Sequence, residues 1–135
     1  MHYGKVIGDE DCLYLSIWAH RFSNDGVPEG GQRLPVMCWI HGGGNSIGYG
    51  DFYHAARLSQ QEKVIVVTIN YRLGPLGWFS HPALRSRAET SDDASGNYGL
   101  LDIILALQWV RDNVSAFGGD PGNVTVFGES AGGGN

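Results

Sequence analysis

The sequence predicts an α/β protein in which a mostly parallel sheet carries helices on both faces. Predicted strands and helices alternate along the chain, which is the pattern that produces such a sheet. Residues 36–40 and 64–69 form short, strongly apolar runs, as expected of parallel strands buried on both faces. Glycine-rich segments follow the run at 36–40 and another predicted strand at 124–127. Because ligands bind at the carboxyl ends of strands in such sheets, we expect the two glycine-rich segments to form one site.

The elements between these strands follow from local patterns. Residues 13–19 alternate apolar and more polar side chains, which predicts an outer strand with two unlike faces. The segment 23–31 is rich in turn-forming residues and predicts a loop. Residues 52–61 predict a short helix with Asp51 as its cap. Residues 74–93 open with Gly-Pro and predict a long loop with little regular structure.

The clearest helical pattern runs from residue 97 to residue 117. Apolar residues recur there every three or four positions, at Ile103, Leu107, Val110, Val114 and Phe117, and the apolar face is widened by Leu100, Ile104 and Trp109. A helix that is apolar over so much of its circumference is expected to be buried under other elements. Gly118, Gly119 and Pro121 end it, and the strand at 124–127 is expected to lie at an open edge of the sheet.

Composition limits the classes of function. The chain has 135 residues, 42% of them hydrophobic, and a formal net charge of -5, which describes a soluble globular protein and disfavours nucleic acid or anionic membrane as partners. No apolar run approaches the length of a membrane span. Cys12 and Cys38 lack the spacing of a zinc site and are read as two free thiols. Residues 41–48 miss the dinucleotide-binding pattern, so we expect neither a metal nor a cofactor.

Residues 128–132 read Gly-Glu-Ser-Ala-Gly, the pattern G-x-S-x-G. In this pattern a strand runs into a turn so tight that the serine backbone is strained and its hydroxyl is exposed. The run at 124–127 supplies the strand, so Ser130 is the candidate nucleophile. Side chains at Gly128 or Gly132 would collide with neighbouring backbone. The pentapeptide alone is also compatible with an ordinary loop.

Acyl transfer also needs fixed N–H donors for the oxyanion that forms on the carbonyl oxygen. Residues 41–44 read His-Gly-Gly-Gly directly after a predicted buried strand, and glycines let the main chain approach a substrate closely. The candidate donors are the amides of Gly43, Gly44 and Ala131. The alternative interpretation of these glycines is a flexible loop.

The remaining candidates are supporting residues. His41, beside Gly42, is expected to brace the glycine segment, and Glu129 is read as a structural carboxylate. The other histidines are read as loop or surface residues. In this type of site the base histidine follows the serine and an acidic residue in chain order, and only five residues follow Ser130. The base and the acid are therefore expected further along a longer protein.

Two long segments carry a family resemblance. Residues 10–18 (EDCLYLSIW) and 117–133 (FGGDPGNVTVFGESAGG) resemble the signature segments of the type-B carboxylesterases, the cholinesterase-like α/β-hydrolases. Residues 39–44, 70–77 and 96–102 also resemble that family, in the same order. The resemblance implies an α/β-hydrolase fold, a small-molecule ester substrate and Ser130 as nucleophile. It also implies an oxyanion hole built from Gly43, Gly44 and Ala131.

The resemblance also implies that residues 1–135 are one partial domain, truncated at both ends. Such a fragment is expected to be inactive alone, because the triad acid and histidine lie outside it. It is also expected to fold poorly, because its apolar strands lack cover and its last strand is an open edge. Secreted relatives pair the cysteine that matches Cys12 with one upstream, so its pairing stays open. Asn45 stands where many relatives carry a bulky aromatic residue, so acyl preference is not carried over. Compartment, oligomeric state and substrate are not predicted.

Two other classes of function remain as alternatives. One is a non-catalytic, cholinesterase-like adhesion or binding module, against which the retained Ser130 counts because adhesion relatives typically lose the serine. The other is an α/β-hydrolase that acts on bonds other than carboxylic esters, since fold and nucleophile do not fix the leaving group.

Overall fold

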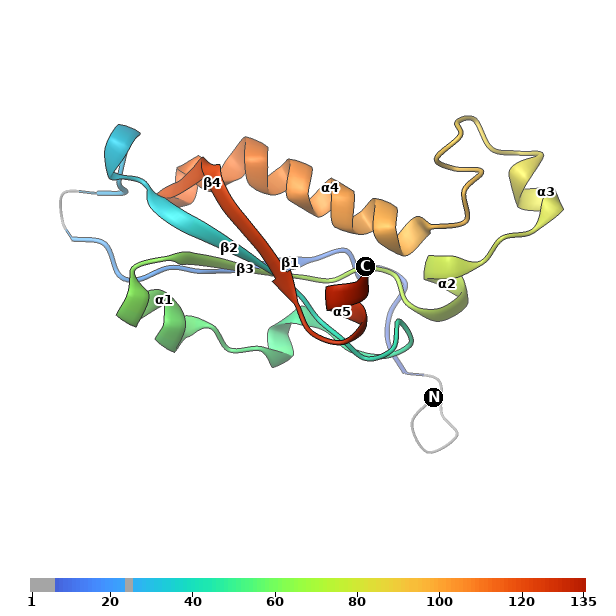
Figure 1. The fold of residues 1–135 in the computed structure, drawn as a ribbon, viewed down its shortest axis with the longest axis horizontal. Helices are drawn as coiled ribbons and strands as arrows, with labels where there is room; N and C mark the ends of the chain where they lie inside the picture. The colour runs from blue at the N-terminus through green and yellow to red at the C-terminus, as the bar shows by residue number, and fades with distance from the viewer. Residues whose placement is uncertain (1–6, 24–25) are drawn as a thin grey trace.

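The computed structural model describes residues 7–23 and 26–135. Within them, one sheet has the strand order β1-β3-β2-β4. Its strands are β1 (Leu15–Trp18), β2 (Leu34–Ile40), β3 (Ile65–Ile69) and β4 (Gly119–Gly128). β2 runs parallel to both β3 and β4, whereas β1 pairs with β3 in the antiparallel sense (Figure 1). The prediction of a mostly parallel sheet is confirmed, with β1 at one edge and β4 at the other.

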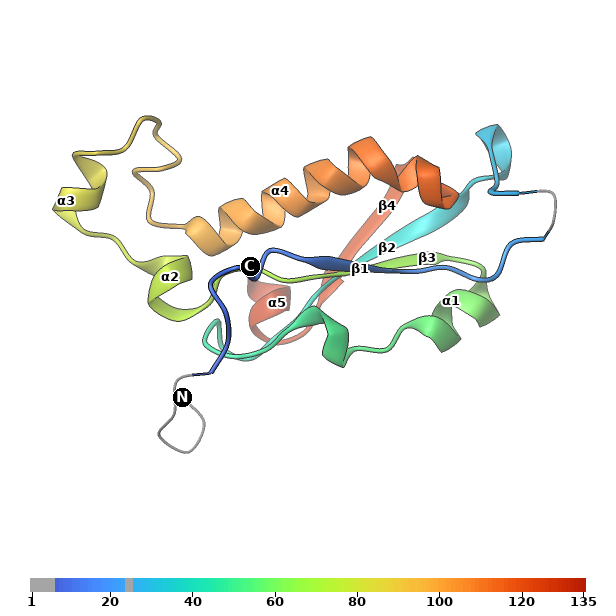
Figure 2. The same cartoon turned by 180° about the vertical axis from the view of Figure 1, so that it is seen from behind.

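Helices lie on both faces of this sheet, as predicted. The α-helices are α1 (Ala56–Glu62), α2 (Gly74–Trp78), α3 (Pro82–Arg85), α4 (Tyr98–Asn113) and α5 (Ala131–Gly134). Short 3-10 helices are η1 (Gly30–Gln32), η2 (Gly50–Phe52) and η3 (Val114–Phe117). α4 crosses one face and α1 lies under the other, which Figure 2 shows from behind. α2 and α3 lie at one end of the molecule, near the amino end of α4.

The core lies between the sheet and α4. It consists of Val36, Cys38, Ile40, Ile65, Val67, Ile69, Tyr71, Ile103, Val110 and Val114. All five residues of β3 are buried, as predicted for the run at 64–69. β2 departs from the prediction that both of its faces are buried, because Met37 and Trp39, on the face away from α4, are only half-buried. There Trp39 packs against the rings of Tyr53 and Phe127, each at 4.9 Å, and these two rings leave part of its surface open.

The expectation that the long helix is buried under other elements holds for one face only. Ile103 and Val110 are buried against the sheet, but Ile104 is 43% exposed, Leu105 58% and Phe117 39%. α4 meets the sheet along one stripe, and the described part of the chain places no other element on its outer side (Figure 1). The helix boundaries are as predicted, since α4 continues into η3 and ends at Gly118 with a φ of 79°.

Two local predictions also need correction. Asp51 does not cap a helix: it lies in η2 and accepts a hydrogen bond from the Ser16 hydroxyl, and α1 begins only at Ala56. The segment 74–93 contains α2 and α3, each with a proline in its first turn. Proline is well suited to that position because its φ is preset and its missing N–H would have no helical partner there. The Gly-Pro pair that suggested a loop therefore lies at the start of a helix.

Candidate active site

The predicted nucleophile lies on a sharp turn between a strand and a helix. β4 ends at Gly128, α5 begins at Ala131, and Ser130 between them has φ 55° and ψ -124°. Such a conformation costs a residue with a side chain about 1–3 kcal/mol, so it persists only where the surroundings impose it. Ser130 is exposed, as the pattern G-x-S-x-G predicts. We call residues 128–132 the elbow.

The two glycines of the elbow are required by packing. A Cβ atom added to Gly128 would overlap the carbonyl oxygen of Gly132, and one added to Gly132 would overlap the carbonyl oxygen of Ile40. There is no room for a side chain at either glycine because the elbow packs directly against the end of β2, where Ile40 pairs with Gly128. The predicted collisions of side chains at both positions are confirmed.

The second glycine-rich segment lies directly against the elbow. An ideal Cβ on Gly42 would lie 2.8 Å from the carbonyl oxygen of Glu129, 2.9 Å from Oε2 of Glu129 and 3.1 Å from Cβ of Ser130. The two segments are brought together because β2 and β4 are parallel neighbours that end at the same edge of the sheet. The two glycine-rich segments therefore lie in contact, as expected, and a shared site remains a prediction.

Hydrogen bonds orient the peptide groups of residues 41–48, which we call the glycine loop. The carbonyl of Gly42 lies 2.7 Å from Nδ1 of His41, and the carbonyl of Gly43 accepts from the amides of Ser46 at 3.1 Å and Ile47 at 3.2 Å. In a trans peptide the carbonyl and the following N–H point in opposite directions. Fixing these two carbonyls therefore also fixes the directions of the N–H groups of Gly43 and Gly44.

The candidate donor amides are unengaged. Within residues 7–23 and 26–135, the amides of Gly43, Gly44 and Ala131 donate to no other protein group. Gly43 has φ 109° and Gly44 has φ 60°, conformations that favour glycine. Both residues are exposed, so their N–H groups are accessible to a ligand.

His41, the first residue of the glycine loop, is buried and is held in place by Tyr71. It is 1% exposed and stacks on Tyr71 with ring centroids 4.5 Å apart, and the Tyr71 hydroxyl donates to the His41 carbonyl at 2.6 Å. Burial lowers the pKa of His41, while the bond to Gly42 raises it by less. The ring is therefore neutral near pH 7, with Nδ1–H as the donor to Gly42. Its Nε2 is buried and has no hydrogen-bond partner among the described residues.

Acidification is expected to destabilise the protein through His41. Because the folded-state pKa lies below the ordinary value of 6.5, the neutral ring stabilises the fold fully above that pH. The contribution is lost as the pH falls through the folded-state pKa, since protonation puts a charge on buried Nε2. Urea unfolding at about pH 7.5 and about pH 5 should show a smaller pH-dependent loss in His41→Asn than in wild type. His54→Gln, at an exposed position, is the control, and equal losses in wild type and His41→Asn would contradict the assignment.

The other histidines do not reach the candidate nucleophile. His20 packs on Phe22, and the exposed His54 packs on Trp18. His81 accepts from the amide of Ala83 at the start of α3. His2 lies outside the described residues. In the part of the chain that the structure describes, no histidine is hydrogen-bonded to Ser130.

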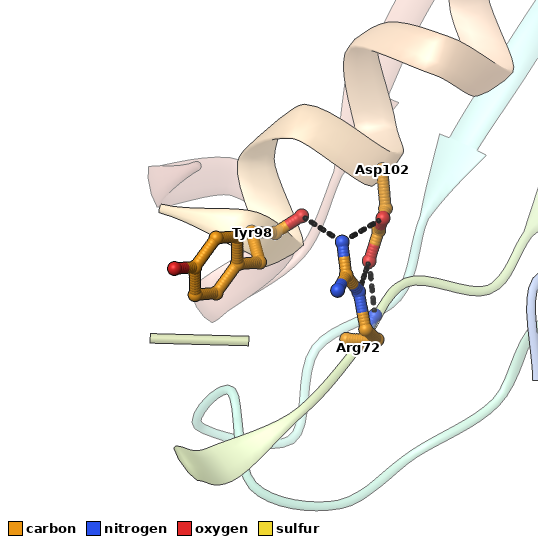
Figure 3. Close-up of polar contacts among 3 residues, drawn as sticks. All are labelled: Arg72, Tyr98 and Asp102. Carbon is orange, nitrogen blue, oxygen red and sulfur yellow. Dashed lines mark hydrogen bonds and ion pairs between the residues drawn. The ribbon is translucent and has the colours of Figure 1, made fainter. Parts of the chain in front are cut away.

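An ion pair that the sequence analysis missed holds the segment after β3 (Figure 3). Asp102 of α4, whose side chain is 4% exposed, accepts from Arg72 through Nε and Nη2, each at 2.8 Å, and through the backbone amide at 3.0 Å. The guanidinium also lies 5.3 Å from the ring centre of Tyr98. Arg72 follows Tyr71, so the pair fixes the residue on which His41 stacks. The signal for this ion pair in the sequence was the carboxylate of Asp102 among the apolar residues of the predicted helix.

Three further findings bear on the sequence expectations. Cys12 and Cys38 are not paired with each other, and burial raises the pKa of Cys38 to about 11. Among residues 7–23 and 26–135, no helix has both the length and the apolar character needed to cross a membrane. An open pocket of about 360 Å³ lies beside the glycine loop and is lined by Gly44, Asn45, Ser46, Gly74, Pro75, Trp78 and Phe79.

Comparisons with known proteins agree with this geometry. The profile described as "Carboxylesterase family" matches residues 1–135. The chain is 53% identical over 125 residues to "Fumonisin B1 esterase" of Sphingopyxis macrogoltabida, covering 91% of this chain and 22% of that protein. It is 54% identical over 126 residues to "Para-nitrobenzyl esterase" of Bacillus subtilis (strain 168), covering 92% of this chain and 23% of that protein.

A solved structure is similar as well. One titled "PNB ESTERASE" superposes with a TM-score of 0.74 at 50% identity and covers 92% of this chain and 24% of that one. The chain thus spans less than a quarter of the length of each of these proteins.

Proposed function

Because the chain belongs to the carboxylesterase family and has the architecture of an incomplete α/β-hydrolase, we propose that it carries the nucleophile and the oxyanion hole of a serine hydrolase. The bond cleaved is that of a carboxylic ester. The observation that carries this proposal is the contact between the glycine loop and the elbow, which brings unengaged amides to an exposed serine on a strained turn. The substrate is a small-molecule ester.

In the proposed reaction, Oγ of Ser130 attacks the carbonyl carbon of the ester as its proton passes to a general base. The carbonyl oxygen becomes an oxyanion, which accepts hydrogen bonds from the amides of Gly43, Gly44 and Ala131. Collapse of the tetrahedral intermediate breaks the bond to the leaving oxygen, which takes the proton back from the base and departs as the alcohol, and leaves an acyl group on Ser130. Water then attacks the acyl-enzyme and releases the carboxylic acid.

Supporting roles follow from the contacts at the site. His41 holds the carbonyl of Gly42, so it sets the direction of the Gly43 N–H without touching the substrate. The carbonyl oxygen and the carboxylate of Glu129 both lie close to Gly42. This contact supports a structural role for Glu129 rather than the role of the triad acid. In this type of fold the serine, the acid and the histidine follow one another in that order along the chain. We therefore propose that the acid and the base histidine come from a part of the protein beyond these residues.

A fluorophosphonate probe tests this proposal directly. We expect it to form a covalent adduct with the protein that contains residues 1–135, and peptide mapping to place the adduct on Ser130, because phosphonylation requires an activated serine. Heat-denatured protein serves as the control for unspecific labelling. A native protein that does not react, or that reacts at another serine, would contradict the assignment.

A further inference from the structure

We propose that Asn45 and Asn135 form a clamp that fixes the glycine loop relative to the elbow, a positioning role that rests on the proposed function. Nδ2 of Asn45 donates to Oδ1 of Asn135 at 3.0 Å, and Nδ2 of Asn135 donates to Oδ1 of Asn45 at 3.1 Å. The two side-chain amides thus form a reciprocal pair between residues 90 positions apart in the sequence. We call this pair the amide clamp.

Each partner is tied to one half of the site. Asn45 follows the glycines and has φ 55°, and its carbonyl accepts from the amide of Gly74 at 2.6 Å. Asn135 donates its backbone amide to the carbonyl of Ala131 at 3.0 Å, so its position follows that of α5. α5 begins directly after Ser130. Movement of the loop relative to the elbow would therefore break the amide clamp.

The clamp matters because the proposed oxyanion donors come from both halves. Gly43 and Gly44 lie on the glycine loop, whereas Ala131 lies at the start of α5. Among the described residues, the amide clamp provides the only side-chain hydrogen bonds between residues 41–48 and 128–135. All three donors must lie within hydrogen-bond distance of one oxygen atom, and small errors in such a geometry have large effects on rate.

The residue types suit this role. An amide both donates and accepts, so two asparagines form two hydrogen bonds, whereas an aspartate in either position could only accept. Asn135 is exposed and Asn45 half-buried, so loss of the pair leaves no deeply buried group without a partner. Its loss should therefore affect catalysis more than stability.

The test is a double-mutant cycle in the protein that contains residues 1–135, with p-nitrophenyl acetate as substrate. We expect Asn45→Ala and Asn135→Ala each to lower kcat about tenfold and to change KM less than about twofold, because the donors act mainly in the transition state. The double variant should be no slower than the slower single variant, since either change breaks the whole pair. Asn135→Asp should lose at least as much activity as Asn135→Ala, because a carboxylate keeps the bond from Nδ2 of Asn45 but sets an oxygen against Oδ1 of Asn45.

Asn123→Ala removes an exposed amide from β4 and is the matched control, expected to retain wild-type kcat. Thermal unfolding of each variant checks the fold, and Asn135→Ala alone carries the test if Asn45→Ala does not fold. Suppose that Ser130 of these proteins still reacts with a fluorophosphonate. Unchanged kcat in the single variants would then overturn the clamp, and so would a double variant whose loss of kcat equals the product of the two single losses. Wild-type protein that does not react at Ser130 would overturn the proposed function and the clamp together.

Discussion

Ser130→Ala is expected to lower kcat for p-nitrophenyl acetate by about 10⁴- to 10⁶-fold, the range found when single members of a catalytic triad are removed. The reason is that no acyl-enzyme can form without the hydroxyl, and Ser130 is the exposed hydroxyl of the elbow. Stability should change little, because alanine keeps the backbone strain at φ 55° and the side chain packs against little. Steady-state kinetics on purified, folded variant are the measurement.

Ser91→Ala provides the matched control, since Ser91 is an exposed serine on the segment between α3 and α4. It should retain wild-type turnover. A folded Ser130→Ala variant whose kcat stays within about tenfold of wild type would show that another residue is the nucleophile.

Gly43→Val should lower kcat by about 10²- to 10³-fold, the loss that accompanies removal of one oxyanion donor. Its φ of 109° is strained for any residue with a Cβ, and that Cβ would overlap the carbonyl oxygen of Ile47. The loop must shift to accept the side chain, which moves the N–H away from the reacting oxygen. KM should change far less than kcat, because the lost interaction forms mainly in the transition state.

Two glycine variants calibrate this result. Gly44→Ala should be milder, because its φ of 60° lies in the left-handed region that a side chain occupies at moderate cost and its Cβ would meet nothing within 4 Å. Gly31→Ala, which lies outside the site and also has open space, should be neutral. A Gly43→Val variant that raises KM and leaves kcat unchanged would contradict the oxyanion role.

Local sequence patterns predicted the parts of the fold that local physics controls. Alternation at 13–19 placed an outer strand, and apolar runs placed β2 and β3. The pattern G-x-S-x-G predicted a strained turn that the φ of Ser130 confirms. Such features depend on side-chain period and backbone conformation within a few residues, so a single sequence contains their signal.

The features that the sequence did not reveal depend on distant partners. Arg72 and Asp102 are 30 positions apart, and their pairing depends on how α4 lies over the end of β3. Asn45 and Asn135 meet only because two parallel strands end at one edge. The exposure of Leu105 could not be predicted either, because the apolar pattern of a helix does not say how many elements pack around it.

The glycine loop presents main-chain N–H groups to the proposed reaction. The groups that would stabilise charge are therefore different from the side chains that would contact the rest of a substrate. The exposed side chains of Ile47 in the loop and of Tyr49 just after it are not needed for the N–H groups of Gly43 and Gly44 to face the proposed oxyanion. Substitution at these neighbouring positions can reshape what the loop touches without altering the atoms that stabilise charge. Changes at the rim of the proposed site are therefore expected to alter which esters it accepts, while its main-chain donors stay the same.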